Sequence, residues 1–76
     1  MIINPEREPT LSLYYLGSVI LEILFEKNDE QIELLFELTK SSFNKDLHID
    51  FFYYALDWLY MLSCIKLEKG RVFLCV

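Results

Sequence analysis

Apolar residues recur at helical spacing along most of the chain and alternate with polar residues, as in a β-strand, only near its end. This pattern predicts helices over about residues 10–26, 29–42 and 48–63, with Asn28-Asp29 ending the first helix and capping the second. The residues expected to face the core are Leu13, Leu16, Val19, Ile20, Ile23 and Leu24 in the first helix, Ile32, Leu35, Phe36, Thr39 and Phe43 in the second, and Phe52, Ala55, Leu56, Leu59 and Leu62 in the third.

The last residues, "CIKLEKGRVFLCV", predict a β-hairpin that turns at Lys69-Gly70. Residues 1–9 contain both prolines and are expected to form an extended arm, whose first residues, Met1-Ile2-Ile3, could add a third short strand. Three helices followed by a hairpin is the order of elements in a winged helix. The sequence therefore predicts one α+β, winged-helix-like domain over residues 1–76.

Each predicted helix carries apolar residues on more than its core-facing side, and the excess is largest on the third. A chain of 76 residues has no second layer of its own to cover this excess. Exposed apolar patches usually mark interaction sites, and Tyr and Trp carry much of the binding energy at interfaces. A place in the core is the alternative for the aromatic stripe of the third helix. The predicted partner interface is Tyr14, Leu21, Phe25, Phe51, Tyr54, Trp58 and Met61.

Composition strengthens the case for a protein partner and weakens the case for nucleic acid. Hydrophobic residues make up 54% of the chain, and 7 Lys and Arg stand against 12 Asp and Glu, for a net charge of −5. Such a charge repels phosphate, whose neutralisation supplies most of the affinity for DNA. The only charges of the third helix are Asp50 and Asp57, which do not suit major-groove reading.

A second class of function, a dimeric winged-helix regulator that binds DNA, remains open on the sequence alone. Homodimerisation would then cover the additional apolar faces. The residues that could contact phosphate are Lys66, Lys69 and Arg71 in the predicted hairpin, although Glu68 dilutes their charge. A solvated hairpin tip is the plainer interpretation of this cluster.

No set of residues in the sequence indicates catalysis, a metal site or a cofactor site. His48 is the only histidine and is expected at a helix start, while Cys64 and Cys75 are expected to be small buried hydrophobes. Gly17 and Gly70 are the only glycines, so a glycine-rich phosphate loop is absent. Gly17 lies inside a predicted helix, where close approach of another helix, or mere tolerance, would explain it. We expect a protein that is not an enzyme.

The cysteine content and the N-terminal residues favour a cytoplasmic protein with reduced thiols. The longest stretch without a charged residue is the 12 residues from Thr10 to Leu21. A membrane-spanning helix needs about 20 apolar residues. We therefore expect no transmembrane segment.

The stretches "INPEREPTLSLYYLGSVIL" and "ALDWLYMLSCIKLEKGRVFL" resemble a small middle-component family of the ABC-three component systems, the bacterial defence operons related to Lamassu. The matching residues are Ile3-Asn4-Pro5, Ser12 to Gly17 and Ala55 to Tyr60, so the likeness covers essentially the whole chain. The segment from Glu26 to Leu47 carries little family signature. Ser63-Cys64 departs from the glycine expected before the wing, which leaves the geometry of that junction open.

This resemblance implies a non-catalytic subunit encoded between an effector, often a nuclease, and an ATPase similar to Rad50 and SMC proteins. The ATPase would sense foreign or aberrant DNA, and the effector would act. The middle component would bridge or restrain the two. An acidic, aromatic-rich small domain with surplus apolar faces agrees with such a role.

Overall fold

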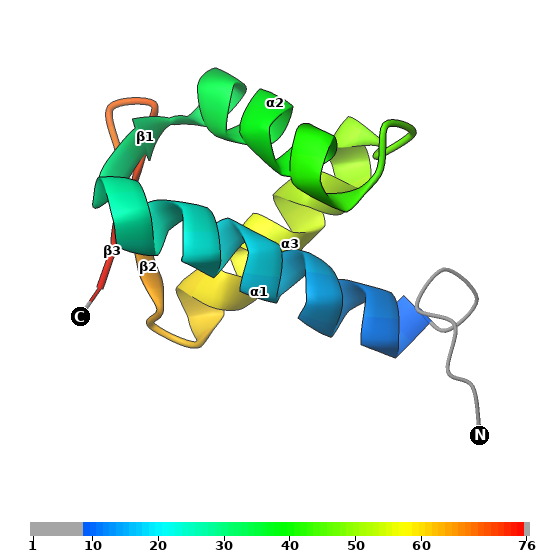
Figure 1. The fold of residues 1–76 in the computed structure, drawn as a ribbon. Coiled ribbons are helices and arrows are strands. Elements are labelled where there is room, and N and C mark those ends of the chain that lie inside the picture. Colours follow the sequence, from blue (N-terminus) through cyan, green and yellow to red (C-terminus); the bar gives the residue numbers. More distant parts are fainter. Residues whose placement is uncertain (1–8, 76) are drawn as a thin grey trace.

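The computed structural model describes residues 9–75 and shows three α-helices and three short antiparallel β-strands (Figure 1). The elements are α1 (Pro9–Lys27), β1 (Asp29–Gln31), α2 (Ile32–Phe43), α3 (Ile49–Met61), β2 (Ile65–Glu68) and β3 (Arg71–Leu74). The helices form one layer, with α1 against both α2 and α3, and the small sheet lies at one end of them. The predicted α+β fold is confirmed. The winged-helix resemblance and the extent of the domain stay predictions.

Helix α1 begins at a proline and ends at an asparagine in the left-handed conformation. Pro9 suits the first helical turn because its missing N–H would have no partner there. Asn28 has φ 66°, and its N–H donates to the Leu24 carbonyl oxygen over 2.6 Å. Asparagine accepts this conformation more readily than most residues, so it ends the helix sharply.

The segment after Asn28 is a strand, which corrects the prediction that Asp29 begins the second helix. β1 pairs with β3, with Asp29 opposite Phe73 and Gln31 opposite Arg71. The pairing extends back to Asn28, whose carbonyl oxygen accepts from the Leu74 N–H over 3.1 Å. The backbone hydrogen bonds of β3 are thus satisfied on both sides, and this outweighs the helical preference of Glu30 and Gln31.

β3 is the central strand of the sheet, in the order β1-β3-β2. The predicted turn at Lys69-Gly70 is confirmed, because Glu68 pairs with Arg71 across two loop residues. Lys69 has φ 50° and Gly70 has φ 76°. Positive φ at both central positions is the type I′ turn, which matches the twist of a hairpin. The predicted arm covered residues 1–9, but Pro9 already belongs to α1. Residues 1–8, whose first three could have added a strand, lie outside the described residues, and the third strand of the described sheet is β1.

Helix α3 is closed at both ends by local hydrogen bonds. His48 is its N-cap, as its imidazole Nδ1 accepts from the Asp50 N–H over 3.2 Å. At the other end the Ser63 N–H donates to the Tyr60 carbonyl (2.9 Å) and the Cys64 N–H to the Leu59 carbonyl (3.0 Å). These two bonds form a Schellman motif, with Ser63 at φ 62° where glycine is usual. The junction left open by the missing glycine is therefore tight.

Replacing Ser63 with glycine is expected to raise the free energy of unfolding by about 1 kcal/mol, because glycine adopts the left-handed conformation without a Cβ clash. Urea unfolding followed by circular dichroism measures the change. Ser41→Gly, in an exposed helical position, is the control and is expected to lose about 0.5–1 kcal/mol. A loss of stability for Ser63→Gly would contradict the strained cap.

The core is formed by the predicted faces of the three helices together with one residue from each of β2 and β3. Its fully buried side chains include Leu16, Ile20, Leu24, Leu35, Phe52, Leu56, Leu59, Ile65 and Val72. Five predicted core residues are partly buried and pack against this core: Leu13, Ile23, Ile32, Phe36 and Phe43. Leu62, which was also predicted to face the core, is exposed. The reason is that α3 ends at Met61 and Leu62 is already in the C-cap, where the helical face no longer directs it inward.

Candidate protein interface

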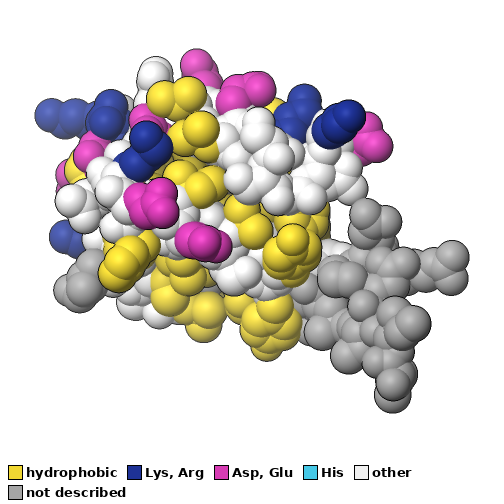
Figure 2. All heavy atoms as spheres, in the orientation of Figure 1, with side chains coloured by type: hydrophobic (Ala, Val, Ile, Leu, Met, Phe, Trp, Pro, Cys, Tyr) yellow, Lys and Arg dark blue, Asp and Glu magenta, His cyan; other side chains and the backbone are white. Residues whose placement is uncertain are grey.

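Large apolar side chains lie exposed on α1 and α3. The exposed fraction is 58% for Tyr14, 75% for Phe25, 60% for Tyr54 and 80% for Met61. Figure 2 shows hydrophobic side chains gathered along the lower part of the face that it draws. These four residues belong to the predicted interface, and the structure places all four in contact with solvent. Whether a partner covers them stays a prediction.

Trp58 joins the two helices at the centre of this surface. Its ring lies on Gly17 of α1, where an added Cβ would come within 2.8 Å of the ring atom Cζ3. Tyr14 packs edge-on against the same ring, with the centroids 5.1 Å apart and the planes at 84°. Edge-to-face contact is a favoured aromatic geometry. Gly17 thus leaves room for the close approach of Trp58 of α3, which favours the first of its two predicted explanations.

Gly17→Ala is expected to give no gain in stability, although alanine usually stabilises a helix by about 1 kcal/mol over glycine. The new methyl group has to displace the Trp58 ring, which moves toward water. A red shift of Trp58 fluorescence and the free energy of unfolding are the measurements. Ser18→Ala, at an exposed position on the same helix, is the control and leaves the fluorescence unchanged. A gain of about 1 kcal/mol with unchanged fluorescence would contradict the contact.

The other three predicted interface residues are neither fully buried nor fully exposed. Leu21, Phe51 and Trp58 are partly buried and pack against the core. Phe51 also lies near Tyr54, with centroids 6.5 Å apart. The alternative of a core role was stated for the aromatic stripe of α3, and Phe51 and Trp58 of that stripe are in part packed on the core. We define the α1/α3 aromatic face as Tyr14, Tyr54, Trp58 and Met61. Phe25 lies about 16 Å along α1 from Tyr14 and does not join it directly.

The sequence reasoning missed three exposed tyrosines. Tyr15, Tyr53 and Tyr60 are exposed, so all five tyrosines of the chain reach solvent. Tyr15 faces α2, where its ring lies 5.2 Å from that of Phe43. Tyr53 and Tyr60 are seven residues apart on α3 and therefore share one side of it. That spacing was the signal that could have found them.

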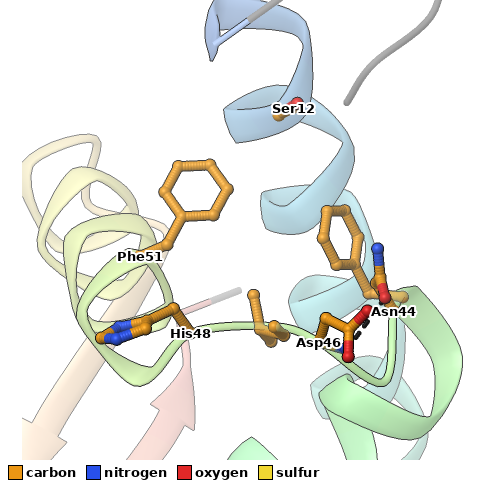
Figure 3. A pocket seen from close by; sticks show the side chains of 7 residues that line it. Ser12, Asn44, Asp46, His48 and Phe51 are labelled. Atoms are coloured by element: carbon orange, nitrogen blue, oxygen red, sulfur yellow. Dashed lines mark hydrogen bonds between the residues drawn. The ribbon is translucent and has the colours of Figure 1, made fainter. Parts of the chain in front are cut away.

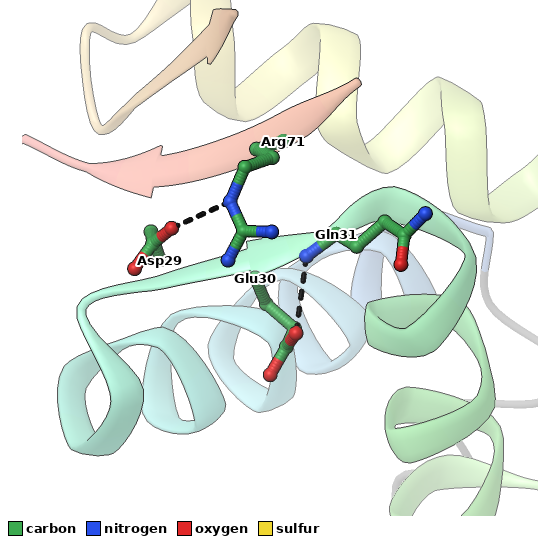
Figure 4. A network of polar contacts seen from close by, with 4 residues as sticks. All are labelled: Asp29, Glu30, Gln31 and Arg71. Atoms are coloured by element: carbon green, nitrogen blue, oxygen red, sulfur yellow. Dashed lines mark hydrogen bonds and ion pairs between the residues drawn. The ribbon is translucent and has the colours of Figure 1, made fainter. Parts of the chain in front are cut away.

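The basic cluster of the hairpin is partly neutralised within the domain. The Arg71 Nε donates to a carboxylate oxygen of Asp29 over 2.7 Å, across the β1–β3 pair (Figure 4). Lys66 and Lys69 are exposed, and so is Glu68 between them. The three residues thus offer less net positive charge to phosphate than their number indicates, and the arrangement gives the DNA-binding alternative no added support.

A shallow pocket of about 340 Å³ lies where α1, the α2–α3 loop and α3 meet. Its lining residues are Ser12, Phe43, Asn44, Asp46, Leu47, His48 and Phe51. In Figure 3 Ser12 and Phe51 lie across it from each other, and His48 lies at the start of α3. The His48 imidazole already accepts the Asp50 N–H, and its Nδ1 lies 3.6 Å from the Asp50 carboxylate. Its role here is that of a helix cap.

The remaining candidate chemistry is sparse in the part of the chain that the structure describes. Cys64 and Cys75 are free, partly buried thiols whose backbones are joined by the Cys75 N–H to Cys64 carbonyl hydrogen bond (2.9 Å). Among residues 9–75, no three His, Cys, Asp or Glu side chains lie together as metal ligands would. None of the described helices combines the length and the apolar character needed to cross a bilayer.

One of three comparisons with known proteins found a match, and it covers nearly the whole chain. A family model described as ABC-three component (ABC-3C) system Middle Component 6 matches residues 3–75. No curated protein and no solved structure matched. The family match includes both end motifs and the weakly characteristic middle. This chain belongs to the Middle Component 6 family of the ABC-three component systems.

Proposed function

We propose that this chain is a non-catalytic adaptor subunit that joins the other two components of an ABC-three component defence system. One partner is an ATPase similar to Rad50 and SMC proteins, and the other is an effector such as a nuclease. The complex acts in the cytoplasm, in a defence system related to Lamassu. Membership of the family supports a role alongside the other components of the system. The identity of the two partners, the adaptor role and the location are part of the proposal.

The observation that carries this proposal is the α1/α3 aromatic face. Tyr14, Tyr54 and Met61 are all more than half exposed, and Trp58 lies between α1 and α3. Side chains of this kind gain free energy when a partner removes them from water, by about 25 cal/mol per Å² of apolar surface. Clustered, exposed aromatic residues are typical of the energetic centre of protein interfaces.

Co-expression of a tagged copy with the genes that flank it, followed by affinity purification and native mass spectrometry, tests the proposal. We expect a stoichiometric assembly that contains this chain, the ATPase and the effector. The mass gives the number of copies of each subunit. Recovery of this chain alone or only as a homodimer would contradict the adaptor role.

A further inference from the structure

The solvent side of α3 combines apolar residues and acids in one stripe. Asp50, Tyr54, Asp57 and Met61 follow one another at intervals of four, three and four residues, the spacing of a single helix face. All four are exposed. Tyr53 and Tyr60 flank the stripe on the side away from Trp58, and both are exposed as well. A partner that covers Tyr54 and Met61 therefore also covers two carboxylates.

These carboxylates have little compensation within the domain. No side chain among the described residues forms a hydrogen bond or ion pair with the Asp57 carboxylate. The Asp50 carboxylate lies 3.6 Å from His48 Nδ1, which already accepts the Asp50 N–H, and is otherwise favoured only by its place in the first turn of α3. Helix α3 contains no Lys or Arg, and α1 has none until its last residue, Lys27. Burying an unpaired carboxylate costs several kcal/mol, which would cancel much of the gain from the aromatic residues.

We propose that the partner segment that docks on α3 is an amphipathic helix whose apolar stripe is flanked by Lys or Arg. This inference rests on the proposed function and adds the chemistry of the partner. Asp50 and Asp57 are about 10 Å apart along the helix axis, the rise of two helical turns. Basic residues seven positions apart on the partner match that spacing. Arginine suits it best, since it pairs with carboxylates and stacks on Tyr53 and Tyr60.

A second copy of this chain is a poor occupant of the same face. A two-fold dimer through α3 places Asp50 and Asp57 of one copy against the same acids of the other. Helix α3 has no Lys or Arg, so neither copy can neutralise the acids of the other at that contact. Like charges held close together at an interface cost several kcal/mol. The charge pattern thus favours a different, basic partner.

The test uses the complete complex purified from cells that express the flanking genes with a tagged copy of this chain. In the Asp50→Lys/Asp57→Lys variant, recovery of the partner is expected to fall by about tenfold or more. Glu37→Lys, an exposed acid on α2, is the matched control and keeps wild-type recovery. Raising NaCl from about 0.05 M to about 0.5 M weakens the wild-type complex, because the shorter Debye length screens the pairs.

Two results separate this inference from the function on which it rests. If the wild-type chain recovers no partner, the adaptor function itself fails. If the wild-type complex forms but the double Lys variant and the salt series leave recovery unchanged, the basic-helix inference is wrong and the adaptor function stands. Should the double variant not fold, as circular dichroism would show, Asp57→Asn takes its place: it preserves the helix, and we expect it to reduce the salt dependence. An unchanged salt dependence in Asp57→Asn would overturn the inference.

Discussion

Phe52→Ala is expected to lower the free energy of unfolding by about 3–5 kcal/mol. Phe52 is completely buried between the helices, and its ring lies 5.1 Å from Phe36 and 5.9 Å from Tyr53. Truncation removes its transfer free energy and leaves a cavity that the small core cannot close. A domain of this size has a total stability of about 4–11 kcal/mol, so the variant lies close to unfolding.

Urea unfolding at low protein concentration, followed by circular dichroism, measures this loss. Phe25→Ala is the matched control, since the same side chain is 75% exposed there. We expect a change within about 0.5 kcal/mol for the control. Equal losses for the two variants would contradict the assignment of the core to Phe52 and of the surface to Phe25.

Tyr54→Ala is expected to weaken the complex by about 2 kcal/mol or more, roughly thirtyfold in affinity, while the free domain keeps its stability. Tyr54 is 60% exposed, so its removal leaves no cavity in the free domain. In the complex, however, it lies at the centre of the stripe on α3 and loses its contacts with the partner. Recovery of the partner at graded concentrations of the complex gives the change in affinity.

Tyr15→Ala is the matched control for this experiment. Tyr15 is exposed on α1 but packs beside Phe43 of α2, away from the α1/α3 aromatic face. We expect its removal to leave the affinity within about twofold. If Tyr15→Ala weakened the complex as much as Tyr54→Ala, the interface would lie elsewhere than on α3.

The helices and the hairpin were predictable because each depends on local pattern. Periodic apolar residues gave the core faces, and Lys69-Gly70 gave the turn between β2 and β3. Strand β1 was not predictable in this way. Its three polar residues have no alternation, and they become a strand only because β3, about forty residues later in the chain, offers a free edge.

For the interface residues too, exposure was predictable where it depends on local pattern and not where it depends on packing between helices. A helical wheel identifies Phe25, Tyr54 and Met61 as lying off the core face, and the structure shows them exposed. It does not say how far the neighbouring helix covers Trp58, because that depends on how α1 and α3 cross. Gly17 was the one sequence signal of that crossing.

Ser63 shows why the end of α3 was hard to predict from the sequence. A glycine would have indicated a left-handed helix end, whereas serine gives no such signal. The Schellman hydrogen bonds from Ser63 and Cys64 impose the conformation from the surrounding structure. The sequence therefore predicts the end of α3 only to within two residues, and the prediction that Leu62 faces the core is wrong.

Hydroxyl-radical footprinting of the free chain and of the purified complex tests the central claim most directly, because tyrosine, tryptophan and methionine are among the side chains that react fastest. Tandem mass spectrometry separates neighbouring residues, so each tyrosine is read individually. We predict that Tyr14, Tyr54 and Met61 become protected in the complex while Tyr15 reacts as in the free chain. Unchanged labelling of Tyr54 and Met61 in a complex that contains the partners would contradict the account.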